Sequence, residues 1–452
     1  STSTSAGAIE LSGIGVNPSI SNMTINGGGY NLYATNNASG VFTNNIFNAA
    51  NAESIYLINN ANGVISIDST NTITNAPAPY AMNQVFPSAD IYASIGAGVI
   101  DTYSVHLSGN FNAANSILTP DPLGTGSSAY LVAGSIAVNN GSRLQIDPYT
   151  VMKFNSGTSL SVQIGGTLDV YGTPTAPVIM TTVNDDSVAP ILATSTGTPG
   201  IGSWSGIQYQ AASLGTISDA QVRYANNALE ITAASPTITN FTATEFGFIG
   251  LYLRTFAANQ IANPTVTNIV LTTSDTFNYP IYMTSSTADA TQVIAPVING
   301  TSITTASIST SLGAIHLSGI GVNPSISGMT INGSGYNLYA TNSASGVFTN
   351  NVLNGAATSA IYLANGASPT INITNVVQNT PAAYELANQL LPASASPTLG
   401  INGTNVIDPY TLRITGALPA SVLDYIMNPD PLGIGSSVYQ ITGSLNIASG
   451  AR

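Results

Sequence analysis

The amino-acid sequence predicts an all-β protein folded as a parallel β-helix, a β-solenoid of about one and a half tandem modules. Three observations lead to this prediction. A long segment occurs twice, short apolar–variable–apolar triplets recur at a spacing of 23 residues, and turn-forming residues separate the triplets.

The long segment is the first of these observations. Residues 8–48 and 314–354 differ at six of forty-one positions, at a constant offset of 306. The similarity resumes at an offset of 309, where Pro120–Gly124 recurs as Pro429–Gly433. Repeats this similar are typical of tandem arrays in elongated proteins. We expect the final coils of one module in residues 1–85, a connector in 86–128, a complete module in 129–390, a second connector in 391–437 and the first strands of the next module in 438–452.

The triplets define the shorter period. Their middle residues, 10, 33 and 56 in the first copy and 316, 339 and 362 in the second, are 23 residues apart. Strict alternation of apolar and variable residues indicates strands with one buried face, and the intervening Asn, Gly, Pro and Ser are turn formers. Short strands that return at a fixed spacing predict a coil wound on itself, with neighbouring coils about 4.8 Å apart. Like residues then stack on like, as Asn and aromatic ladders do in cross-β structures.

Two segments also carry a family resemblance. Residues 159–182, followed by Gly-Ser-Trp-Ser-Gly-Ile at 202–207, resemble the right-handed parallel β-helix repeats of large bacterial and archaeal surface proteins and adhesins. Residues 141–154 resemble the opening coil of such a domain. The resemblance implies a right-handed coil and a location at the cell surface. It implies no single activity, because the same solenoid is used by lyases, adhesins and fibres.

The composition excludes several classes of protein. Only 6% of the residues are charged and the net charge is −13, which argues against binding to nucleic acid. A hydrophobic content of 44% argues against disorder. The absence of cysteine excludes disulfides and thiolate metal sites. No apolar run approaches the roughly 18 residues that a membrane-spanning helix needs, so no membrane span is expected.

The acidic residues are poor candidates for catalysis. Polysaccharide lyases and glycosidases of this fold need two or three carboxylates, or an aspartate with Arg or Lys, on one exposed face. The second copy has His316 in place of Glu10 and Ser359 in place of Glu53. The acids that persist, Asp101/Asp408 and Asp121/Asp430, lie in turn motifs, where an aspartate binds its own backbone. We therefore assign no catalytic residue and no cofactor. His106 and His316 lack a second ligand at metal spacing and are expected to be exposed structural residues.

Asp185 and Asp186 form the one adjacent acidic pair that could supply oxygen ligands to Ca²⁺. No calcium-binding loop motif accompanies them, so the sequence favours a solvated loop. Residues 420–427 are expected to form a short capping helix.

The tyrosines in the middle of the triplets are the candidate interaction residues. Stacked on successive coils they would form an outward aromatic stripe, which suits packing against a neighbouring fibre or binding to sugar faces. A third interpretation is that they fill the strand face and stack only on one another. The candidates are Tyr33, Tyr56, Tyr252, Tyr282, Tyr339 and Tyr362.

These features predict a structural role at the cell surface. We expect a segment of a giant repetitive extracellular protein, fibre or sheath, whose main partner is itself through head-to-tail or lateral contacts. The alternatives are an adhesin stalk that binds glycans through the tyrosine face and, less favoured, a polysaccharide lyase or glycosidase.

Overall fold

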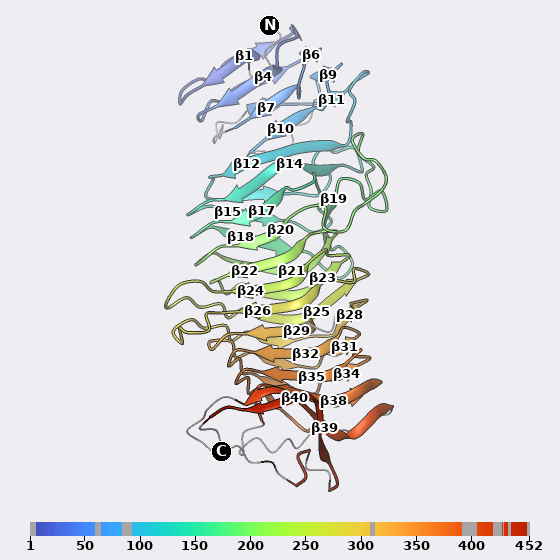
Figure 1. Cartoon of the computed structure of the whole chain (residues 1–452). Coiled ribbons are helices and arrows are strands. Elements are labelled where there is room, and N and C mark those ends of the chain that lie inside the picture. The colour runs from blue at the N-terminus through green and yellow to red at the C-terminus, as the bar shows by residue number, and fades with distance from the viewer. Residues whose placement is uncertain are drawn as a thin grey trace. The chain divides into compact units, whose positions relative to one another are not determined.

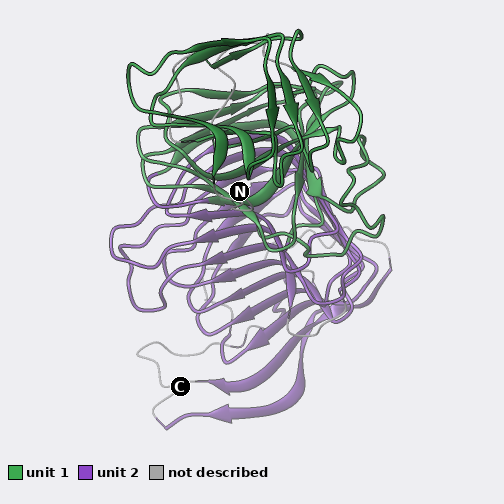
Figure 2. Ribbon diagram, turned by 90° about the horizontal axis from the view of Figure 1, so that it is seen from above, with its two compact units in different colours: residues 1–208, 213–225 green, residues 209–212, 226–452 purple. Residues whose placement is uncertain are grey.

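The protein consists of β-strands and turns. The computed structural model describes residues 6–58, 65–83, 93–307, 312–390, 405–418, 427, 429–432 and 435–449, and these contain no helix. Residues 420–426 of the expected capping helix lie outside that range. The chain divides into two compact units, residues 1–208 with 213–225 (unit 1) and residues 209–212 with 226–452 (unit 2), shown in Figure 2.

Unit 1 is a stack of parallel strands in which most strands pair with a strand of the coil before and a strand of the coil after (Figure 1). The longest ladder runs through β1 (Gly7–Ser12), β4 (Tyr30–Thr35), β7 (Ile55–Leu57), β10 (Tyr80–Met82), β12 (Ser104–Phe111), β14 (Ala129–Val138), β16 (Val151–Phe154), β19 (Val178–Thr182) and β21 (Leu214–Arg223).

Shorter ladders form the other faces of unit 1. One contains β2 (Ser19–Ser21), β5 (Gly40–Thr43) and β8 (Ile65–Ile67), and another β3 (Thr24–Asn26), β6 (Ile46–Asn48), β9 (Thr72–Thr74) and β11 (Ser94–Ile95). A further ladder contains β13 (Ser116–Leu118), β15 (Arg143–Ile146), β18 (Thr167–Tyr171) and β21, while β17 (Ser159–Val162) pairs with β14. Strand β20 (Gly206–Tyr209) ends at the boundary between the units.

Unit 2 repeats this architecture. Its first ladder contains β22 (Asn227–Thr232), β24 (Ile249–Arg254), β26 (Tyr279–Thr284), β29 (Gly313–Ser318), β32 (Tyr336–Thr341), β35 (Ser359–Ala364), β38 (Thr380–Ala387), β39 (Val406–Leu418) and β40 (Val438–Ile447). A second contains β23 (Thr237–Thr244), β25 (Thr265–Thr273), β27 (Val297–Asn299), β30 (Ser325–Ser327), β33 (Val347–Thr349) and β36 (Thr370–Ile371). The third branches from β25 through β28 (Ser302–Thr305), β31 (Thr330–Asn332), β34 (Val352–Asn354) and β37 (Val376–Gln378).

The core lies inside the coil, where apolar side chains of successive strands stack in register. In β24 the side chains of Leu251 and Leu253 are fully buried, whereas Tyr252 between them points outward. Burying one such aliphatic side chain contributes about 1.5–3 kcal/mol. The same inward column continues through residues that are at most 1% exposed, namely Leu229, Ile281, Ile315, Leu338 and Ile361.

The prediction of a parallel β-helix is therefore confirmed, and so is the expectation that residues 316, 339 and 362 stack in register. The right hand of the coil and the module boundaries stay predictions. Within the expected connectors the ladder continues, because β12 pairs with β10 and β14, and β39 pairs with β38 and β40.

Buried asparagines hold the corners of the coil in both copies. Asn351 donates to the Asn375 side chain (2.9 Å) and to Ile326 O (3.1 Å), and accepts from Met329 N (3.0 Å). In the first copy Asn45 makes the matching contacts with Asn71, Ile20 and Met23. An amide both donates and accepts, so it satisfies backbone groups at a corner and still bonds to the next asparagine.

Candidate functional site

The outward residues of the first ladder in unit 2 form an aromatic column, defined here as Tyr252, Tyr282, His316, Tyr339 and Tyr362. These residues are partners in register on five consecutive strands. Successive ring centroids are 5.3, 5.0, 4.5 and 4.5 Å apart, and the rings are stacked except between Tyr282 and His316, which meet edge to face. Such aromatic pairs contribute about 0.5–1.5 kcal/mol beyond their area burial.

A second file of tyrosines lies beside the column. Tyr279 packs against Tyr282 (5.0 Å) and His316 (5.2 Å), and Tyr336 packs against Tyr362 (4.8 Å). The sequence analysis missed this file. Its signal is the Tyr-x-x-Tyr spacing at 279–282 and 336–339, which places a second ring at the start of the same strand.

The column is half-buried and electrically neutral. Each of its tyrosines alternates along its strand with buried apolar residues. Burial is the first cause that raises the pKa values of Tyr252, Tyr339 and Tyr362, although Arg254 opposes the shift at Tyr252 and the hydrogen bond with Tyr362 opposes it at Tyr339. These three phenols therefore stay protonated at neutral pH and offer flat, uncharged rings with hydroxyl groups.

Charged residues lie at both ends of the aromatic column. At one end Arg254 forms an ion pair with Glu230, and its guanidinium lies 5.1 Å from the ring centre of Tyr252. At the other end Glu385 follows Tyr362 in register and accepts a hydrogen bond from Ser359 Oγ (3.3 Å). Burial raises the pKa of Glu385, although Ser359 and the next residue in register, Arg413, oppose the shift.

His316 behaves as an aromatic ring of the column. Burial lowers its pKa to about 4, so the imidazole is neutral at pH 7. Its Nδ1 is buried and has no hydrogen-bond partner among the described residues. The expectation of an exposed histidine is therefore wrong here, because its neighbours Tyr279, Tyr282 and Tyr339 cover the ring.

The first copy places a charged cluster, Glu53, Asp101 and His106, on its own first ladder. His106 Nδ1 lies 2.7 Å from Glu53 Oε1, and Nε2 lies 3.8 Å from Asp101 Oδ2. Asp101 also accepts hydrogen bonds from Ser104 Oγ (2.7 Å) and Tyr103 N (3.2 Å). The His106 side chain is 16% exposed, so the prediction of an exposed, isolated histidine is wrong here as well.

The cluster is ionised at neutral pH. Burial by itself would lower the pKa of His106, but the carboxylates of Asp101 and Glu53 outweigh it and raise the pKa to about 9. Burial likewise opposes ionisation of the two acids, and contacts with His106 nevertheless lower both pKa values. An imidazolium between two carboxylates is held as an ion pair, and while protonated it cannot accept a proton as a general base.

Tyr33 and Tyr56 lie on the same ladder, in register and 5.6 Å apart, and Tyr30 packs 4.7 Å from Tyr56. The next residues in register are Ala81 and then His106. The structure thus brings the candidate tyrosines together as neighbours within each unit. Their role in an interaction stays a prediction.

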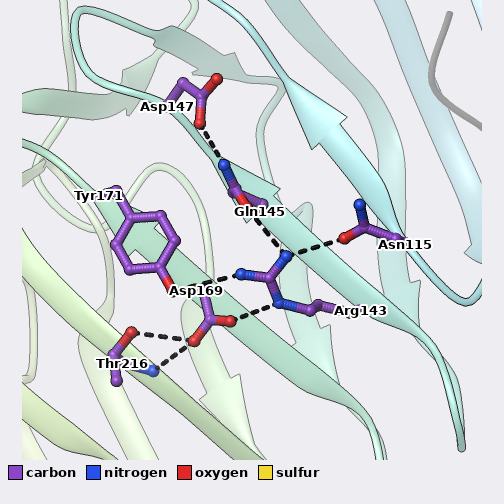
Figure 3. Close-up of polar contacts among 7 residues, drawn as sticks. All are labelled: Asn115, Arg143, Gln145, Asp147, Asp169, Tyr171 and Thr216. Carbon is purple, nitrogen blue, oxygen red and sulfur yellow. Dashed lines mark hydrogen bonds and ion pairs between the residues drawn. The ribbon is translucent and has the colours of Figure 1, made fainter.

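A polar network lies on another face of unit 1 (Figure 3). Arg143 donates from Nε to Asp169 Oδ2 (2.7 Å) and from Nη1 to Asn115 (2.8 Å) and Gln145 (2.9 Å). Asp169 accepts two further bonds from Thr216, through the backbone N–H (3.0 Å) and Oγ1 (2.9 Å). The network ties β15, β18 and β21 together across three coils.

The structure separates the two candidate calcium ligands. The Asp185 carboxylate accepts hydrogen bonds from Thr181 Oγ1 (2.7 Å) and Ser187 Oγ (2.6 Å), and lies 3.3 Å from Arg223 Nη1. Asp186 instead accepts a bond from Ser195 Oγ (2.6 Å). In the part of the chain that the structure describes, no three His, Cys, Asp or Glu side chains come together in a way that could hold a metal ion. Calcium binding by this pair is untested, and the solvated loop that the sequence favours is wrong for Asp185, whose side chain is 1% exposed.

Comparisons of this chain with protein-family models, with curated proteins and with solved structures find no match. Among the described residues, no helix has the length and apolar character needed to cross a membrane.

Proposed function

We propose that this chain is a structural segment of a giant repetitive extracellular surface protein, a fibre or sheath assembled from parallel β-helix modules. The observation that carries the proposal is that the two copies keep the same packing contacts but exchange their charged groups. The hydrogen bonds between corner asparagines recur, and so does the pairing in register of two neighbouring tyrosines, Tyr33 with Tyr56 and Tyr339 with Tyr362. Selection on packing rather than on a reactive group leaves this pattern.

The acidic and basic residues of this ladder stand at different positions in the two copies, and the loss of an acid at one position is matched by an acid at another. Glu53, which contacts His106 in the first copy, is replaced by Ser359 in the second. There Glu385 stands beside Arg413, at the position that corresponds to Ala81 beside His106. Each copy therefore has one acidic residue near one basic residue on this ladder, Glu53 near His106 in the first copy and Glu385 beside Arg413 in the second. A catalytic pair would be expected to keep its residue types and its geometry.

An adhesin stalk is the second candidate, and one observation favours it. The aromatic column presents five half-buried rings in register, and sugar faces stack on rings of this kind. A polysaccharide-degrading enzyme is the least supported alternative, since Asp121 and Asp430 are bound in turns and Glu53, Asp169 and Asp185 in ion pairs.

The proposal is tested on native cells and on purified chain. Antibodies against the chain, visualised by gold labelling, should decorate a fibre or sheath, and aligned material should diffract at the strand spacing of about 4.8 Å along its axis. Labelling confined to the cell interior would refute the proposal.

A glycan array separates the fibre from the adhesin. Purified chain in which Tyr252, Tyr282, Tyr339 and Tyr362 are changed to Ser is compared with the unchanged chain. The matched control is Tyr149→Ser, a tyrosine outside the column that is 65% exposed. Glycan binding that is lost only in the column variant supports the adhesin, whereas no binding by either chain supports the fibre.

A further inference from the structure

Asn–Gly pairs are the chemically labile element of this chain. Glycine supplies the positive φ that tight turns need, and asparagine suits the neighbouring turn position, so the pair recurs at turns of the coil. Its weakness is a reaction within the pair, in which the glycine nitrogen attacks the asparagine side chain. The sequence contains eight such pairs, and six of them lie among the described residues, beginning at Asn26, Asn140, Asn299, Asn332, Asn354 and Asn365.

The reaction needs no reagent other than water. The glycine backbone nitrogen forms a bond to the asparagine Cγ, and the side-chain nitrogen leaves as ammonia together with the proton of the glycine N–H. Water then opens the resulting succinimide at either carbonyl and leaves aspartate or isoaspartate. The glycine N–H must be free for the first step, because a nitrogen that donates a hydrogen bond is held away from Cγ and keeps its proton.

The next coil binds the glycine N–H in all six described pairs. In five of them the acceptor is a backbone carbonyl oxygen at 2.9–3.1 Å, namely Asn48 O for Gly27, Gly165 O for Gly141, Ser327 O for Gly300, Asn354 O for Gly333 and Gln378 O for Gly355. These bonds belong to the stack of coils, so they open only when neighbouring coils separate.

Gly366 differs from the other five glycines because its acceptor is a side chain. Its N–H donates to Gln389 Oε1 (2.6 Å), and Gln389 Nε2 donates to Ala367 O (2.9 Å). The Gln389 side chain is 6% exposed, whereas Asn365 and Gly366 are both exposed. One buried amide therefore holds this turn, and its loss would free the Gly366 N–H to water without separating the coils.

We infer that Asn365–Gly366 is a latent self-modification site, kept unreactive in the folded chain by the side-chain amide of Gln389. The other five described pairs are kept unreactive by the stack itself. Reaction at Asn365 would place a carboxylate, and in isoaspartate an additional backbone methylene, on a chain that has only six Lys and Arg residues to balance it. The inference concerns the chain itself and holds for a fibre and for an adhesin alike.

The test follows deamidation by peptide mapping and mass spectrometry while the purified whole chain is incubated at mildly alkaline pH. Asn354 in the same molecule is the internal control, since its side chain accepts a bond from Asn379 (2.7 Å) much as Asn365 accepts one from Asn388 (3.0 Å). Both asparagines should react slowly in the folded chain and at the rate of free peptides in the denatured chain. Gln389→Met keeps the side-chain length and removes the acceptor, so Asn365 should react about five- to tenfold faster and Asn354 at an unchanged rate.

A second variant, Gln389→Glu, separates the acceptor from the packing of the turn. Glutamate keeps an acceptor for Gly366 N and loses the donor to Ala367 O, so Asn365 should stay protected. The inference is overturned if Asn365 reacts at the peptide rate in the unchanged folded chain, if Gln389→Met leaves its rate unchanged, or if Gln389→Met accelerates Asn354 equally. It is also overturned if Gln389→Glu reacts as fast as Gln389→Met, because both variants would then act by loosening the turn.

Discussion

The two histidines of this chain should titrate far apart, although both lie in the outward column of a β-ladder. The pKa of His106 is raised to about 9, whereas that of His316 is lowered to about 4. The difference arises from their neighbours. His106 lies between Glu53 and Asp101, whereas His316 lies among tyrosine rings and is in contact with no carboxylate of the described residues.

The magnitude for His106 follows from linkage. A rise of its pKa from 6.5 to about 9 corresponds to about 3 kcal/mol of stabilisation. Because the pKa in the folded state is the higher one, this stabilisation is fully present below pH 6.5 and is lost as the pH rises through 9. The lowered pKa values of Glu53 and Asp101 act in the opposite direction, since their contribution is lost as the pH falls through the acidic range.

The assay is direct because the chain contains only two histidines. Nuclear magnetic resonance of imidazole-labelled protein should show one resonance that titrates near pH 9 and one near pH 4. The variants His106→Gln and His316→Gln assign them. In parallel, unfolding free energies of the unchanged chain and of His106→Gln should converge between pH 6.5 and 9. Two histidines that both titrate near 6.5 would refute the reasoning about the charged cluster and the aromatic column together.

Three further outcomes are expected. Asn351→Ala should cost about 1–3 kcal/mol in the free energy of unfolding, because it leaves Met329 N without its acceptor, and chemical denaturation measures this loss. Asp185→Asn should lower the melting temperature through loss of the Arg223 ion pair, whereas Asp186→Asn should leave it within the error of thermal scans. Column variants such as Tyr339→Ser should weaken lateral association in sedimentation assays without unfolding the coil. If the substitution leaves association unchanged, the rings only fill the strand face and do not take part in an interaction.

Most of the fold could be predicted from the sequence because β-solenoid contacts repeat at a nearly fixed spacing. A residue 23 positions further along the chain is the neighbour in register, as Tyr339 and Tyr362 show. Inserted loops lengthen the spacing to 30 residues between Tyr252 and Tyr282 without moving either residue out of register. Alternation then fixes which side chains enter the core.

The charged cluster could not be predicted in the same way. Glu53 and His106 are 53 residues apart, and Glu53 lies outside the strands, so no period connects them. Their contact spans the position of Ala81, the residue in register between Tyr56 and His106. The methyl side chain of Ala81 leaves space for the Glu53 side chain to reach His106, and a larger side chain at this position would fill that space. The second tyrosine file was missed for a simpler reason, because its rings start the strands and precede the triplets.

The comparison of the two copies shows how these local contacts are linked. In the second copy Glu385 occupies the position of Ala81 and would fill the room through which Glu53 reaches His106, and Ser359 stands where Glu53 would be. Because Ser359 Oγ lies 3.3 Å from Glu385 Oε2, a glutamate at 359 would place two carboxylates against each other, without the imidazolium that lies between Glu53 and Asp101 in the first copy, and such a half-buried like-charge pair is costly. Between the first and the second copy the glutamate therefore shifts by one coil, from Glu53 to Glu385, and the basic residue changes from His106 to Arg413. The constraint acts on the charge balance of neighbouring coils rather than on any single residue, which is the constraint expected of a stacked structural element.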